Sequence, residues 1–138
     1  MSFFHVLLFG FISNVAFGRD ASGSVSGNLS CADGSISLRS QLAFSAFMSD
    51  VPVYGNWEIT SNNGSSLGTH NIAGYLSGGN VGNQDFDLKG TETSDDICGT
   101  QITSGITISG FCGPTGTVQI NLNNGWRGEF GGNIECTG

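Results

Sequence analysis

The chain has 138 residues, of which only 11% are charged, and its 11 acidic and 4 basic residues give a formal net charge of −7. Nucleic acids and anionic lipid surfaces bind clustered Lys and Arg, so this composition argues against both as partners. A content of 23 glycines would suit a disordered chain, but ten Phe, two Trp and regular apolar alternation predict one folded domain.

The first 18 residues have the pattern of an export signal. An apolar run over residues 3–17 ends at the small residues Ala16 and Gly18, which form a small-x-small cleavage site. We therefore expect residues 1–18 to be a signal peptide and residues 19–138 to be a single secreted or cell-surface domain. No Lys or Arg precedes the run, which is untypical of such signals. A retained anchor is the alternative, but a span needs roughly 20 apolar residues, and polar residues interrupt this run.

Alternation with period two dominates the chain after residue 22 and predicts an all-β domain. We expect about eight strands, over residues 23–31, 35–48, 53–60, 65–77, 86–93, 104–112, 118–122 and 126–136. Short strands joined by tight turns are typical of an antiparallel meander that closes into a small barrel or folds as a sandwich.

The turns are marked by glycine and asparagine. Asn62 to Gly64 has the composition of a type I′ hairpin turn, and residues 123–125 indicate another. A change of phase in the apolar positions predicts a bulge near Asn71. We further expect a loop over residues 78–83 and a turn over residues 113–116.

Four cysteines follow the proposed signal, and an even number in an exported chain predicts two disulfides. No two lie closer than 14 positions, which argues against a metal site built on close cysteine pairs. Alternating strand directions place Cys31 and Cys98 at one end, and Cys112 and Cys136 at the other. Because a disulfide needs Cα atoms within about 7 Å, we favour pairing within each end. Pairing Cys98 with Cys112 is the alternative if one strand is misassigned.

Catalytic chemistry has little support in the sequence. His70 is the only histidine after the signal, and no Gly-x-Ser-x-Gly motif surrounds a serine. Four carboxylates fall on outward strand positions, where a glycosidase would need two of them to face each other across a cleft. They are Glu58, Asp85, Asp87 and Glu92. We expect no catalytic residues, no cofactor and no enzyme activity, and a carboxylate-dependent glycoside hydrolase is the least favoured alternative.

Two surface features give weaker signals. The oxygen-bearing side chains of Asn80, Asn83, Asp85 and Asp87 lie on or beside the expected loop and would suit calcium, but we favour a polar hairpin loop and expect no metal there. Asn28 and Asn63 stand in Asn-x-Ser sequons and are candidate glycosylation sites in an exported chain.

Aromatic residues divide between the two strand faces. Five fall on inward positions and are assigned to the core, namely Phe44, Trp57, Phe86, Trp126 and Phe130. Four fall on outward positions, where a soluble monomer usually places polar groups, namely Phe47, Tyr54, Tyr75 and Phe111. If several of them cluster, they would form a binding patch for a partner or a sugar. The alternative is a sandwich with uneven coverage, in which loops cover them.

Residues 55–59 (GNWEI), 90–99 (GTETSDDICG), 106–113 (ITISGFCG) and 128–138 (GEFGGNIECTG) resemble small, secreted, Gly- and Thr-rich β-proteins of ammonia-oxidising archaea. The resemblance covers most of the chain after the signal and implies no activity. We expect a non-enzymatic secreted or cell-surface β-domain that binds a protein, a glycan or copies of itself. The alternative is a carrier of small apolar ligands with a lipocalin-like barrel.

Overall fold

The computed structural model describes residues 19–50, 52–62, 68–93, 103–123 and 125–137, which are all-β. Its eight strands are β1 (Asp20–Cys31), β2 (Ser37–Met48), β3 (Val53–Asn62), β4 (Thr69–Val81), β5 (Asp85–Thr93), β6 (Thr103–Phe111), β7 (Gly113–Leu122) and β8 (Trp126–Thr137). None of the described residues belongs to a helix capable of crossing a membrane.

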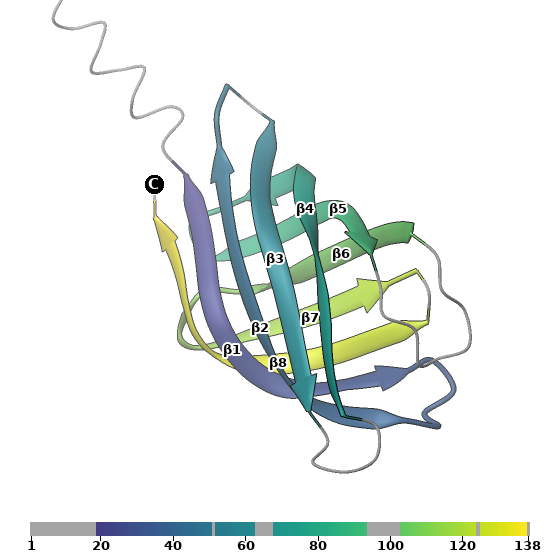
Figure 1. The fold of residues 1–138 in the computed structure, drawn as a ribbon. Helices are drawn as coiled ribbons and strands as arrows, with labels where there is room; N and C mark the ends of the chain where they lie inside the picture. The colour runs from purple at the N-terminus through teal and green to yellow at the C-terminus, as the bar shows by residue number, and fades with distance from the viewer. Residues whose placement is uncertain (1–18, 51, 63–67, 94–102, 124, 138) are drawn as a thin grey trace, which may run out of the picture.

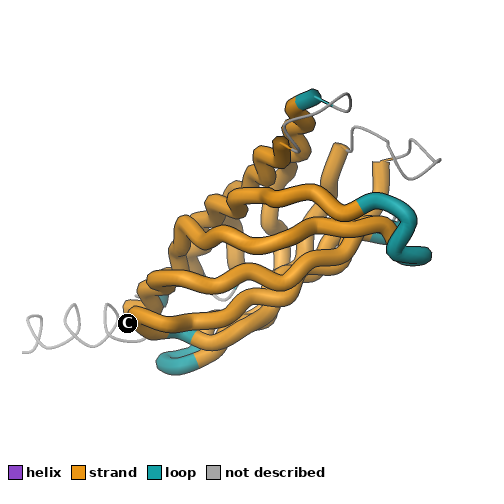
Figure 2. Tube along the Cα trace, turned by 90° about the horizontal axis from the view of Figure 1, so that it is seen from below, coloured by secondary structure: helices purple, strands orange, loops and turns teal. Residues whose placement is uncertain are grey.

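The strands form a closed barrel in which each strand pairs antiparallel with the next, and β8 pairs with β1. This confirms the predicted eight-stranded meander and selects the barrel over the sandwich. In Figure 1, β1 to β4 run steeply while β5 to β8 cross behind them, and β1 itself curves from one direction to the other. Figure 2 shows the described loops at the ends of the strands.

The barrel interior is a continuous hydrophobic core, and the five inward aromatics predicted from alternation are all buried in it. Every strand contributes buried hydrophobic side chains to this core, and most of them are aliphatic. The largest fully buried side chains are Trp57, Trp126, Leu29, Leu38, Leu42, Ile59, Ile72, Leu76, Leu88, Ile108, Ile120 and Ile134.

Glycines at inward positions stand opposite the core aromatics on neighbouring strands. The cross-strand pairs are Phe44 with Gly23, Trp57 with Gly74, Phe86 with Gly110 and Phe130 with Gly27. A Cβ added at Gly74 would overlap the Thr91 carbonyl and lie 2.9 Å from Trp57 Nε1. Alternation of large and absent side chains therefore lets a narrow barrel curve and still fill its interior.

Three local predictions are wrong. The β3–β4 register runs without a break through Asn71, and the irregularity lies instead between Leu76 and Gly78, against β5. β4 continues to Val81, so the expected loop over residues 78–83 is mostly strand. The expected turn over residues 113–116 is instead the first part of β7, and these residues pair irregularly with β8. In the last two cases, pairing with a second neighbour extends a strand that glycine content alone would end.

Of the predicted hairpin turns, the one at residues 123–125 is confirmed by a hydrogen bond of 3.1 Å from the Gly125 amide to the Leu122 carbonyl. Asn63 and Gly64 lie outside the described residues.

The Cys112–Cys136 disulfide is confirmed, with a Cα–Cα distance of 5.8 Å. It joins Cys112, which lies between β6 and β7, to Cys136 near the end of β8, beside the pair Gly113 and Ile134. Cys31 is buried and disulfide-bonded. Its favoured partner, Cys98, lies outside the described residues, so that pairing stays a prediction.

Replacing both Cys112 and Cys136 with Ser should lower the free energy of unfolding by about 3 kcal/mol, because the bridge closes a loop in the unfolded chain. The sequence separation of 24 residues sets this expectation. Urea unfolding of the wild-type and double-variant proteins measures the difference. A peptide map without reductant that joined Cys98 to Cys112 would contradict the pairing.

Gly74→Ala should lower the free energy of unfolding by about 2–3 kcal/mol, because the new methyl group has no room between β3 and β5. Gly78→Ala is the matched control on the same strand, since a Cβ there would meet no atom within 4 Å. Equal unfolding midpoints for the two variants would show that the close approach at Gly74 does not limit stability.

Candidate functional site

The barrel interior does not offer a ligand cavity among the described residues. The hydrophobic side chains of the buried core are at most 4% exposed, and the partly buried Ile36 and Met48 pack against them. A cavity large enough for a small molecule would leave the side chains that line it accessible to water, so this interior is filled. The filling disfavours a carrier that holds its ligand inside the barrel.

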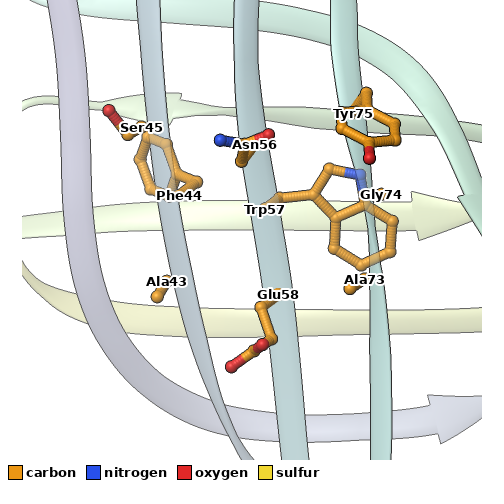
Figure 3. A pocket seen from close by; sticks show the side chains of 9 residues that line it. All are labelled: Ala43, Phe44, Ser45, Asn56, Trp57, Glu58, Ala73, Gly74 and Tyr75. Carbon is orange, nitrogen blue, oxygen red and sulfur yellow. The ribbon is translucent and has the colours of Figure 1, made fainter.

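A shallow hollow lies on the outer face of β2, β3 and β4, and we call it the β2–β4 groove. It is open, with a volume of about 650 Å³. Its outward side chains are Ala43 and Ser45 of β2, Asn56 and Glu58 of β3, and Ala73 and Tyr75 of β4, and its floor is formed at Phe44, Trp57 and Gly74 (Figure 3).

Strand register arranges the outward side chains in two rows across the groove. Ser45 pairs with Asn56, and Asn56 pairs with Tyr75, which makes one polar and aromatic row. The second row runs from Ala43 through Glu58 to Ala73. In this second row, Glu58 is the only long side chain, because the alanines on either side of it are small.

The floor of the groove is fixed by Trp57. Its indole extends from β3 past Gly74 (Figure 3), and Nε1 donates a hydrogen bond of 3.2 Å to the Thr91 carbonyl of β5. Tyr75 pairs with the same Thr91. One buried indole therefore ties together the three strands around the most exposed aromatic of the groove.

Three of the four predicted outward aromatics lie in one region. Phe47 and Tyr54 pair across β2 and β3 with ring centroids 6.1 Å apart. Tyr75, which is 70% exposed, lies on the next strand and one row further along. Phe111 is 63% exposed but lies on β6 beside Asp85, so it belongs to a different part of the surface.

The candidate carboxylates do not form a glycosidase pair across the groove. Glu58 is level with Ala73 and, through it, with Thr93, which lies six residues from Asp87 along β5. Strand spacing and rise then separate Glu58 from Asp87 by about 20 Å, whereas glycosidase carboxylates lie about 5–9.5 Å apart. Glu58 is the only carboxylate among the described residues that line the groove. The side chain of Glu92 is outside the described part.

The candidate calcium ligands are distributed along β4, β5 and their connection. Asn80 pairs with Asp87 in the ladder, and Asn83 Oδ1 accepts a hydrogen bond of 2.8 Å from Arg19. No group of three or more His, Cys, Asp or Glu residues in the described ranges could hold a metal ion. Asn83 Oδ1 therefore already has a hydrogen-bond partner inside the protein, the Arg19 guanidinium.

Of the two sequons, Asn28 is exposed on β1, and Asn63 is outside the described residues. His70 is half-buried on β4, and its carbonyl accepts a hydrogen bond of 3.4 Å from the Ser61 hydroxyl.

The sequence identified Tyr75, Tyr54 and Phe47 but missed the polar and small residues that complete the site. Ser45, Asn56, Ala43 and Ala73 were recognisable only as outward positions. Their strand register, which decides that they adjoin Tyr75 and Glu58, was not available from alternation. No protein-family model, curated protein or solved structure matches the chain, so the site is argued from its own residues.

Proposed function

We propose that the chain is a non-enzymatic, secreted or cell-surface binding domain whose ligand lies in the β2–β4 groove. The observation that carries the proposal is the gathering of Phe47, Tyr54 and Tyr75 on one outer face beside a hollow lined by small and polar side chains. Exposed apolar groups concentrated in this way mark binding surfaces. A single carboxylate at the groove supports binding without hydrolysis.

Closure of the barrel limits how the domain can bind. Each described strand pairs with neighbours on both sides, so the sheet offers no free edge to which another strand could add. A partner of this barrel therefore has to be recognised by side chains and not by strand addition, and the outer face supplies such side chains.

The predicted export signal and the Cys112–Cys136 disulfide support an extracellular setting. Disulfides persist in oxidising compartments, and Cys112–Cys136 would be reduced in most cytosols. The hydroxyl- and amide-rich composition with net charge −7 suits a soluble extracellular surface.

Expression of the full chain in a secreting host tests the setting and the activity together. We expect a secreted protein that starts at Arg19 and carries no free thiol, as measured by intact mass spectrometry before and after reduction. The mature protein should bind at least one member of a panel of purified polysaccharides and extracellular proteins, and the ligand should be recovered unchanged.

Tyr75→Ser should reduce this binding at least tenfold, which corresponds to about 1.4 kcal/mol. The side chain is exposed, so unfolding midpoints of variant and wild type should agree. Retention of a free thiol and the signal would contradict the extracellular setting. Cleavage of the bound ligand, or binding unaffected by Tyr75→Ser, would overturn the proposed site and role.

A further inference from the structure

We infer that the ligand of the β2–β4 groove is a neutral oligosaccharide, an inference that rests on the proposed function and names the chemical class of its ligand. A sugar ring has an apolar face of C–H groups and an edge of hydroxyl groups. The groove presents the complement of both within three adjacent strands.

The aromatic part of the complement is a diagonal run of three rings. Phe47 and Tyr54 stand side by side, and Tyr75 follows on the next strand. Strand spacing and rise give the run a length of about 12 Å, which suits a short oligosaccharide rather than a single ring. Tyr75 is the most exposed of the three, and its neighbour along β4, Ala73, is too small to cover it.

The polar part lies beside Tyr75. Asn56 supplies an amide donor and acceptor, Ser45 supplies a hydroxyl, and Glu58 supplies a carboxylate that accepts hydrogen bonds. Within the part of the chain that the structure describes, these three side chains make no hydrogen bond or ion pair. They can therefore bind ligand hydroxyls without first breaking a contact inside the protein. Hydroxyl groups that donate to a carboxylate form the stronger, charge-assisted kind of hydrogen bond.

The charge of the site selects neutral sugars. Glu58 places a negative charge in the groove, no Lys or Arg lines it among the described residues, and the chain as a whole is acidic. A uronate or sulfate group bound there would meet uncompensated like charge. Acidic polysaccharides should therefore bind less well than neutral ones of similar length.

A protein partner fits the groove less well. Cores of protein interfaces are enriched in aromatic residues, Met and Arg and depleted in Ser, Ala and Glu. Here Ser45, Ala43, Ala73 and Glu58 line the groove together with Tyr75, and the rings of Phe47 and Tyr54 lie one row beyond it. A mixture of exposed rings with small and polar groups matches a small amphipathic ligand better than a second protein surface.

Titration calorimetry of the disulfide-bonded mature protein, with cellohexaose, chitohexaose and mannohexaose as separate neutral probes and hexagalacturonate as the acidic probe, tests the inference. We expect at least one neutral hexasaccharide to bind at least tenfold more tightly than the acidic one. Tyr75→Ser should weaken that binding tenfold or more. Phe111→Ser is the matched control, because it removes a similarly exposed aromatic from β6 and should change the affinity less than twofold.

A substitution at Glu58 tests whether its negative charge selects neutral sugars. Glu58→Gln keeps the shape of the side chain, replaces one accepting oxygen with a donating NH2 group and removes the charge. It should weaken affinity for the neutral hexasaccharide by no more than about tenfold, because a charge-assisted bond is roughly twice as strong as a neutral one. The same variant should bind hexagalacturonate more tightly than wild type does.

Failure of the saccharide inference differs from failure of the proposed function. Binding of a protein, or dimerisation seen by analytical ultracentrifugation, that Tyr75→Ser abolishes while no hexasaccharide binds would overturn the saccharide and keep the groove as a binding site. Stronger binding of hexagalacturonate than of every neutral probe would overturn neutrality. Equal effects of Tyr75→Ser and Phe111→Ser would overturn the site itself.

Discussion

The close approach of neighbouring strands at inward glycines is the constraint on which this barrel depends. A barrel of eight strands has an interior just wide enough for side chains to fill. Phe44 and Trp57 face each other across β2 and β3, yet each faces a glycine on its other neighbouring strand, Gly23 for Phe44 and Gly74 for Trp57. Phe130 is likewise set against Gly27. The inward glycines therefore allow both the curvature of the sheet and the dense packing of the barrel interior.

The same constraint shapes the outer surface. Because Gly74 has no side chain, the Trp57 indole can pass it and reach the Thr91 carbonyl on β5. This contact holds β3, β4 and β5 together immediately beneath Tyr75. The outward ring is thus presented from a backbone fixed by the core, and little order has to be gained when a ligand binds. The position of the groove's floor and of Tyr75 therefore depends on packing inside the barrel as well as on the side chains that line the groove.

Alternation was sufficient to predict the strands and their inward faces. Residues such as Leu42, Ile59 and Phe130 are buried as expected, since a side-chain period of two leaves only two faces to choose between. Alternation was insufficient at glycines, because a glycine can either end a strand or allow a bulge within it. Gly78 and Gly113 are predicted to lie in a loop and a turn, yet both belong to strands at irregular pairings.

The site was harder to predict because it depends on register. Alternation shows that Asn56 and Tyr75 both point outward, but only the β3–β4 pairing shows that they are direct neighbours. The two-residue step between Tyr54 and Tyr75 along adjacent strands also follows from that register. A shift of two residues would keep every side chain on the same face, but it would set a larger β4 residue against Trp57 in place of Gly74 and move Tyr75 away from Asn56. Register therefore decides both the close packing at Gly74 and the composition of the groove.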